Sequence, residues 1–108
     1  MGDIPTLQSL IAGRWHGHEA HTALHSALDN ALIYHTHLEP IDFDEALTFA
    51  RKTGIKSLMG QDFQKRAQCL KALALYLMER KEELYEISHL TGATRQDSWV
   101  DVEGGIGT

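Results

Sequence analysis

The stretch Asp62–Gly92, "DFQKRAQCLKALALYLMERKEELYEISHLTG", decides the fold class of this chain. Its apolar residues recur every three or four positions, which is the spacing of one face of an α-helix. The first part of this face consists of Phe63, Ala67, Leu70, Ala74 and Leu77. Asp62 is placed to cap the first turn, and Gly92 is placed to end the run. Because the run far exceeds the usual helix of ~11–12 residues, we expect a break near Arg80 and Lys81, where a second helix begins.

Another helix is predicted upstream, over "IDFDEALTFARKTG" (Ile41–Gly54). Asp42 can accept a hydrogen bond from the first turn, and Glu45 stands at the capping-box spacing from it. The apolar stripe of this helix consists of Phe43, Ala46, Leu47 and Ala50. Gly54 suits the left-handed position that follows a helix, so we expect the helix to end there.

The C-terminal stretch "TRQDSWVDVEGGIGT" (Thr94–Thr108) is rich in glycine but has helical periodicity. Thr94 and Asp97 have the spacing of a capping pair. The apolar positions, at helical spacing, are Trp99, Val102 and Ile106. A phosphate-binding loop needs a strand before its glycines. The pattern therefore predicts a helix running through the glycines, with fraying or close packing against a neighbour there.

Before Pro40 the chain is less regular and contains two short runs of strand formers. Leu7–Trp15, "LQSLIAGRW", is interpreted as one strand near a turn, and Ala31–His35 as a second strand after the turn pair Asp29-Asn30. The two runs would form a hairpin or two edge strands of something larger. The predicted fold class is mainly α with a short N-terminal β unit, in one domain: a β and loop lead-in over 1–40 and helices over 41–108.

Composition narrows the class of function. The 108 residues carry 10 Lys and Arg against 15 Asp and Glu, a net charge of -5, and the basic residues are scattered. This argues against sequence-independent nucleic-acid binding. No apolar run approaches the ~20 residues of a membrane span, and the N-terminus does not resemble a secretory signal. The single cysteine excludes an internal disulfide. We expect a cytoplasmic protein that binds neither nucleic acid nor a membrane.

A cluster of histidines is the first candidate site. It consists of His16, His18, His21, His25, His35 and His37. His21 and His25 have the spacing that grips one metal ion on a helix, and the two His-x-His pairs have the spacing of one strand face. No cysteine joins the cluster, and only Glu19 adds a carboxylate. We favour a solvated, histidine-rich loop over a metal site.

Other reactive side chains also have structural interpretations. Cys69 lies inside a predicted helix and is interpreted as a packing or boundary thiol, not a nucleophile. Acidic groups cluster at Glu82-Glu83 and Asp42–Glu45, and we assign them to the first turns of helices. Trp99 lies near Arg95 and could stack against the ring of a ligand. Because Trp99 belongs to an apolar helical stripe, we interpret it as a core residue instead. The sequence thus predicts no catalytic, cofactor-binding or metal-binding residue in this chain.

Thr91–Thr108, "TGATRQDSWVDVEGGIGT", resembles one branch of the aldehyde dehydrogenase superfamily. In that branch, which serves bacterial phenylacetate degradation, an aldehyde dehydrogenase is fused to an enoyl-CoA hydratase-like domain of the oxepin-CoA hydrolase type. Semialdehyde dehydrogenases of aerobic benzoate degradation through CoA thioesters are close relatives of it. Leu7–Trp15 is similar to the opening strand of the superfamily, and Ile41–Arg51 and Asp62–Ser88 are similar to its first helices.

The resemblance implies an α/β parent with a Rossmann-like cofactor domain, of which this chain is the N-terminal part, truncated within a helix. The parent would oxidise a CoA-linked semialdehyde with NAD or NADP and form homo-oligomers. The surroundings of Cys69 do not match the family's thiol motif, and the other catalytic residues of the family fall beyond Thr108. We therefore expect this segment to bind no cofactor, to be inactive alone, and to have the remainder of the dehydrogenase as its partner. The alternative is a stand-alone helical interaction module.

Overall fold

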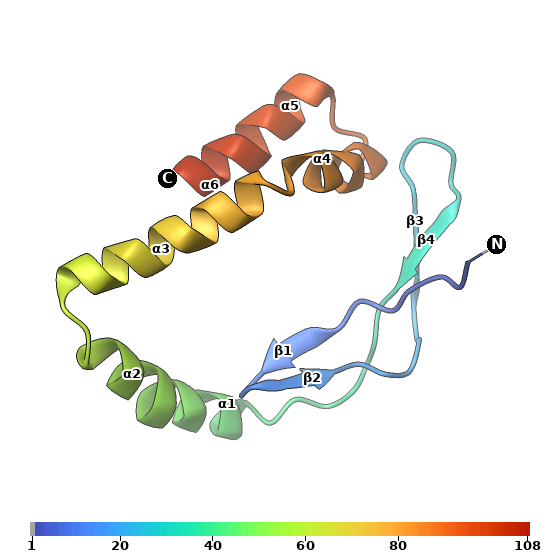
Figure 1. Ribbon diagram of the computed structural model, residues 1–108. Coiled ribbons are helices and arrows are strands. Elements are labelled where there is room, and N and C mark those ends of the chain that lie inside the picture. Colours follow the sequence, from blue (N-terminus) through green and yellow to red (C-terminus); the bar gives the residue numbers. More distant parts are fainter. Residues whose placement is uncertain (1) are drawn as a thin grey trace. The chain divides into compact units, whose positions relative to one another are not determined.

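A computed structural model describes residues 2–108 (Figure 1). The chain divides into two compact units. Unit 1 holds the residues up to His25 together with Asn30–Gly60, and unit 2 holds Ser26–Asp29 together with Gln61–Thr108. Four short strands precede the helices, so the prediction of a mainly α chain with a short N-terminal β unit is confirmed. Within the described residues, no helix combines the length and apolar character needed to cross a lipid bilayer.

The first hairpin pairs β1 (Ser9–Ile11) with β2 (Arg14–His16) in antiparallel register. Its turn consists of Ala12 and Gly13, with φ of 51° and 76°. Positive φ at both turn residues matches the right-handed twist of two strands joined by a two-residue loop. The prediction of a single strand over Leu7–Trp15 is therefore wrong, because the chain reverses inside that run.

The second hairpin pairs β3 (Ala23–His25) with β4 (Leu32–His35). Asn30, predicted as a turn residue, adopts the left-handed conformation with φ of 61°. The partner of β4 thus comes from the histidine-rich stretch, which was predicted to be a loop. The N-terminal segment adds to the other edge of β4, where the Leu7 N–H donates to the His35 carbonyl at 2.7 Å.

The helical part of unit 1 is one continuous helical stretch: α1 (Phe43–Phe49), a π-helical segment η1 (Ala50–Gly54) and α2 (Ile55–Met59). The Asp42 cap is confirmed, since its carboxylate accepts from the Glu45 N–H at 3.0 Å. The predicted stop at Gly54 is wrong. Gly54 has a helical φ of -64°, because the residues after it also form helix and the wide η1 turn accommodates it without a break.

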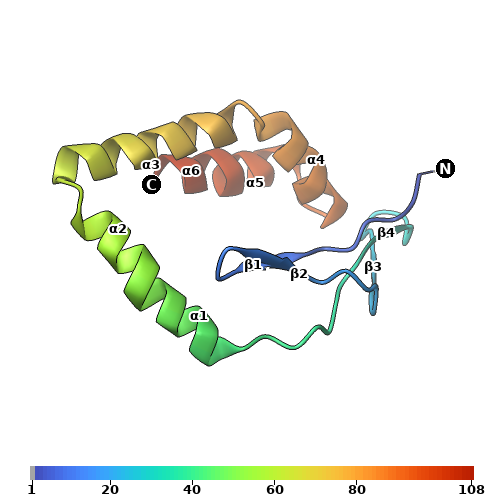
Figure 2. The same cartoon turned by 60° about the horizontal axis from the view of Figure 1, so that its bottom comes forward.

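Unit 2 contains α3 (Phe63–Met78), α4 (Lys81–Leu90) and a last helical stretch of α5 (Arg95–Trp99), η2 (Val100–Gly104) and α6 (Gly105–Gly107). The predicted break between α3 and α4 is confirmed. So are the Asp62 cap, which accepts from the Lys65 N–H at 2.8 Å, and the Thr94–Asp97 capping box. Figures 1 and 2 show α3 and α6 side by side.

The glycines near the C-terminus lie in helix, as predicted, and do not form a phosphate-binding loop. A Cβ added at Gly104, Gly105 or Gly107 would have no neighbour within 4 Å. Close packing against another described residue therefore does not explain these glycines.

The buried core of the described residues is very small. Tyr85, on α4, is the one buried large hydrophobic residue, with 7% of its surface exposed. The predicted apolar face of α3 is largely uncovered: Phe63 is 83% exposed and Leu70 is 69% exposed. The helical periodicity was correct, but the face that it marks has little to pack against within its own unit.

Candidate functional site

The histidines do not assemble into a metal site. Among residues 2–108, no group of three or more His, Cys, Asp or Glu side chains is placed to hold a metal ion. His25 lies on β3 and His21 precedes that strand, so the predicted helical spacing of these two does not occur. His16 and His35 lie on strands, while His18 and His37 follow the ends of those strands. The interpretation as a solvated loop is wrong for His16, His35 and His37, which are half-buried.

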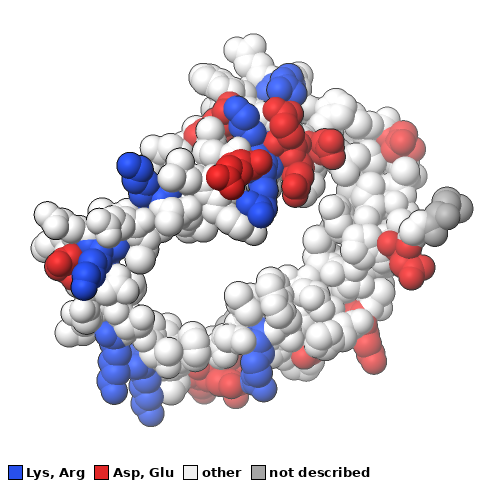
Figure 3. Space-filling model, viewed as in Figure 1, with Lys and Arg blue, Asp and Glu red and all other residues white. Residues whose placement is uncertain are grey.

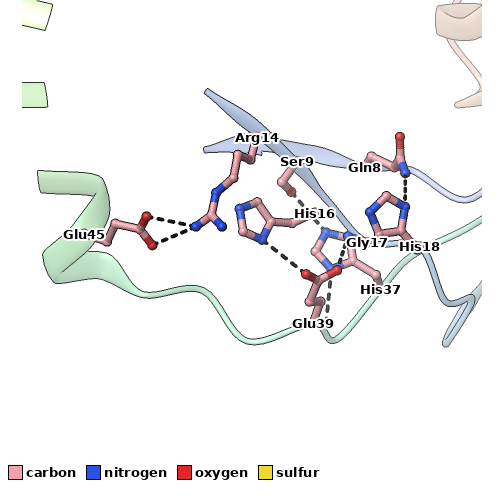
Figure 4. A network of polar contacts seen from close by, with 9 residues as sticks. All are labelled: Gln8, Ser9, Arg14, His16, Gly17, His18, His37, Glu39 and Glu45. Carbon is pink, nitrogen blue, oxygen red and sulfur yellow. Dashed lines mark hydrogen bonds and ion pairs between the residues drawn. The ribbon is translucent and has the colours of Figure 1, made fainter. Parts of the chain in front are cut away.

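Two of these histidines instead join a polar network in unit 1 (Figure 4). The Glu39 carboxylate accepts from the Gly17 N–H at 2.5 Å and from His16 Nδ1 at 3.3 Å. The Glu39 N–H donates to His37 Nδ1 at 3.2 Å, and His37 Nε2 lies 3.2 Å from Ser9 Oγ. The network thus connects the first hairpin to the segment that follows β4.

The Glu39 carboxylate is held in its charged form. The Gly17 N–H donates to it and lowers its pKa below the ordinary value of 4.5, and His16 acts in the same direction. The ionised Glu39 carboxylate therefore stabilises the fold above pH 4.5, and this stabilisation is lost as the pH falls through the lowered pKa of Glu39. An ion pair between Arg14 and Glu45 links β2 to α1, with Nη2–Oε distances of 2.8 and 3.1 Å.

Gly17→Ala is expected to destabilise unit 1 by about 1–3 kcal/mol. Gly17 is buried with φ of 100°, and a Cβ there would collide with the His37 ring. Gly54→Ala is the matched control, because Gly54 has a helical backbone and open space around it. That control should be neutral or stabilising by up to ~1 kcal/mol. Urea unfolding followed by circular dichroism measures both changes, and equal effects would contradict the Gly17 argument.

Unit 2 has its own polar cluster beneath α5 and η2. The Tyr85 hydroxyl donates to Glu103 Oε2 at 2.5 Å, and Lys81 Nζ donates to Glu103 Oε1 at 3.0 Å. The bond to Glu103 raises the pKa of Tyr85 to about 12, and the Tyr85 and Lys81 bonds lower the pKa of Glu103. Arg95 lies 4.9 Å from the Tyr85 ring centroid and also pairs with Glu82. The cluster holds the last helical stretch against α4.

Tyr85→Phe is expected to lower the unfolding midpoint by a few degrees, because it leaves the Glu103 carboxylate without its hydroxyl donor. In the unsubstituted chain, the contribution of the Tyr85 hydroxyl to the free energy of unfolding is complete below pH 10.0 and is lost as the pH rises through about 12. Thermal scans at neutral and alkaline pH should therefore converge for parent and variant at the alkaline end. Tyr76→Phe is the control, since Tyr76 is 53% exposed. A constant difference at every pH would contradict this assignment.

The remaining candidates are placed as follows. Cys69 is exposed on α3, so its interpretation as a packing or boundary thiol is wrong, and its Sγ lies 3.8 Å from Gln61 Oε1. Glu82 and Glu83 lie in the first turn of α4, as predicted. Trp99 is 57% exposed and not part of a core. Sequence reasoning did not identify the Tyr85–Glu103 pair, whose members are distant in sequence and match no motif.

Charge does not define a binding surface in unit 2. Figure 3 shows acidic and basic side chains intermixed over α4 and α5. Two of the basic residues there, Lys81 and Arg95, have carboxylate partners at 3.0 and 3.4 Å. Because opposite charges alternate and pair, this face lacks the single-sign field that attracts a highly charged ligand.

The more distinctive surface of unit 2 is apolar. Two adjoining hollows lie along α3, α4 and the last helical stretch and share Leu77, Gly105 and Ile106. We call this surface the α3–α6 groove; its apolar lining includes Leu70, Leu73, Ala74, Leu77, Val102 and Ile106. Leu70 and Leu73 are 69% and 54% exposed. A contiguous exposed apolar surface of this kind is typical of a face that another polypeptide covers.

Comparison with known proteins indicates a relationship to a dehydrogenase. No family model matches the chain. Among curated proteins, the chain is similar to the 3,4-dehydroadipyl-CoA semialdehyde dehydrogenase of Aromatoleum evansii, with 32% identity over 104 residues. The match covers 94% of this chain and 20% of that enzyme, so the chain spans about one fifth of the length of this relative. The similarity supports a relationship to a CoA-semialdehyde dehydrogenase.

Proposed function

We propose that this chain acts as the N-terminal part of the cofactor-binding domain of an NAD(P)-dependent aldehyde dehydrogenase. The observation that carries the proposal is the similarity over nearly the whole chain to a dehydrogenase of a CoA-linked semialdehyde. The resemblance of Thr91–Thr108 to the phenylacetate-degradation branch of the superfamily points to the same substrate class. The function would be oxidation of a CoA-linked semialdehyde in aerobic degradation of aromatic compounds.

The chain's own residues would contribute structure to this enzyme and no chemistry. Its polar networks form within each unit, around Glu39 in one and Glu103 in the other. Its apolar residues, by contrast, are exposed along the α3–α6 groove. This division fits a segment that folds its polar parts locally and buries its apolar face against the remainder of the dehydrogenase, which would also supply the catalytic thiol and bind the cofactor. We also propose that the dehydrogenase forms homo-oligomers and is located in the cytoplasm.

A chimera tests the proposal. The segment of the Aromatoleum evansii enzyme that matches this chain is replaced by this chain, and oxidation of its CoA-linked semialdehyde is assayed with NAD⁺ and with NADP⁺. We expect activity within about tenfold of the parent enzyme, a difference of ~1.4 kcal/mol. The enzyme with the segment deleted is the control and should be inactive. A folded chimera as inactive as the deletion would contradict the proposal.

The same chimera addresses the substrate. Assays with the semialdehyde named for the relative and with one formed by opening of the phenylacetate-derived ring compare two CoA-linked aldehydes. We expect this segment to leave their ratio of kcat/KM unchanged, because it is proposed not to contact the substrate. A changed ratio would place part of the substrate site on this segment.

A stand-alone helical interaction module is the alternative function, and the exposed α3–α6 groove is the observation in its favour. As such a module, the 108-residue chain would unfold cooperatively as a monodisperse protein. Cosedimentation of the chain with the segment-deleted dehydrogenase separates the two functions, because only the dehydrogenase segment should bind that protein.

A further inference from the structure

We propose that His37 is an acid-sensitive latch, which in its neutral form fastens the segment after β4 to the first hairpin and releases it on protonation. The latch consists of Ser9, Gly17, His37 and Glu39 (Figure 4). This inference does not depend on the dehydrogenase proposal, since it rests on hydrogen bonds within unit 1.

The hydrogen bonds of His37 require one protonation state. The Glu39 backbone N–H can only donate, so His37 Nδ1, 3.2 Å away, must accept with its lone pair. The neutral ring then carries its proton on Nε2, which donates to Ser9 Oγ at 3.2 Å. An imidazolium has a proton on each nitrogen. Its Nδ1–H would face the Glu39 N–H, two donors would oppose each other, and the Glu39 bond would be lost.

Packing couples this bond to the rest of the latch. Gly17 is buried, and the His37 ring lies where a Cβ of Gly17 would be. The Gly17 N–H in turn donates to the Glu39 carboxylate at 2.5 Å. Because backbone and side chain of Glu39 both take part, loss of the bond to His37 also loosens the hold of Glu39 on Gly17. The expected result is a local opening between the first hairpin and the segment after β4.

Other titratable groups surround the latch. Glu39 keeps its charge across the range in which imidazoles titrate, because the Gly17 N–H holds its pKa below 4.5. The negative charge of Glu39 attracts a nearby imidazolium, and this attraction acts against release of the segment after β4. His16 donates through Nδ1 to Glu39, while its Nε2 is buried without a partner among the described residues, as is Nδ1 of His35. Among the described residues, His18 bonds to Gln8, and Arg14 is paired with Glu45. Among the imidazoles named here, that of His37 is the one that accepts a backbone N–H.

Hydrogen exchange of the 108-residue chain tests the latch. Protection factors, which correct for the intrinsic pH dependence of exchange, are measured by NMR at about pH 8 and about pH 5.5. We expect the Gly17 and Glu39 amides to lose about tenfold in protection at the lower pH, while amides within α3 keep theirs. Nitrogen-15 shifts of the His37 ring should show a protonated Nε2 and an unprotonated Nδ1 at the higher pH.

Variants assign the effect to one ring. His37→Gln offers a carbonyl acceptor and an amide donor that take up no proton, so the dependence on pH should disappear. His16→Gln and His18→Gln are the matched controls and should retain it. Equal protection of Gly17 and Glu39 at both pH values would overturn the proposal. So would unprotected amides at the higher pH, a protonated Nδ1 there, or loss of the pH dependence in His16→Gln.

Discussion

The double substitution Leu70→Asp and Leu73→Asp is expected to abolish most of the activity of the dehydrogenase chimera. Both leucines line the α3–α6 groove, which would be covered by the remainder of the enzyme. Burying two carboxylates without partners costs several kcal/mol for each carboxylate. Because each ~1.4 kcal/mol is a factor of ten, we expect at least about a 100-fold loss of assembled, active enzyme. Initial rates measure the activity, and size-exclusion chromatography measures the amount of assembled enzyme.

The same substitution should change the free energy of unfolding of the 108-residue chain alone only slightly. Leu70 and Leu73 are 69% and 54% exposed there, and exposed positions usually change the free energy of unfolding by no more than ~0.5 kcal/mol. Gln68→Asp on the opposite side of α3 is the matched control and should leave the chimera active. Full activity of the double variant would show that the groove is not covered in the enzyme.

The isolated chain is expected to self-associate and to bind a hydrophobic dye. Its exposed large hydrophobic residues include Phe43, Met59, Phe63, Leu70 and Trp99. Surfaces of this kind associate when their partner is missing. Sedimentation velocity should show a weight-average mass that rises with concentration, together with strong dye fluorescence.

Leu70→Asp with Leu73→Asp should reduce both signals, and Gln68→Asp should not. A sharp monomer with weak dye binding at every concentration would contradict this expectation and favour the stand-alone module.

Local signals in the sequence predicted the helical part of the fold well. A helix cap depends on residues three apart, so Asp42, Asp62 and the Thr94–Asp97 pair were identified without any tertiary information. Gly92 was also predicted correctly, and its φ of 92° shows the left-handed conformation that ends α4. The helical spacing across the C-terminal glycines was sufficient to exclude a phosphate loop there.

Features set by context were not predictable in the same way. Ala12-Gly13 lacks the Asn-Gly signature of a two-residue hairpin turn, so the sequence pattern predicts one strand where the first hairpin forms. Gly54 and Gly92 look alike in sequence, but only Gly92 is followed by residues that leave the helix. Helical periodicity identified the apolar face of α3, but periodicity carries no information about which polypeptide covers that face.

The candidate site depended even more on distant residues. Gly17 follows the first hairpin and His37 follows the second, while Tyr85 and Glu103 lie in different helical segments. No spacing rule joins such pairs, so both networks became visible only in the structure. The histidine cluster showed the reverse case. Its spacings matched metal sites, but among residues 2–108 no three such side chains are placed to hold a metal ion.

The measurement that tests the central claim most directly is the mass of the native polypeptide that contains this segment. Proteins from the source cells are separated under denaturing conditions, and peptides of residues 62–108 are located by mass spectrometry. We expect a polypeptide several times heavier than 12.1 kDa that also yields peptides of a dehydrogenase catalytic domain. A native species of 12.1 kDa would contradict it and would make the interaction module the leading function.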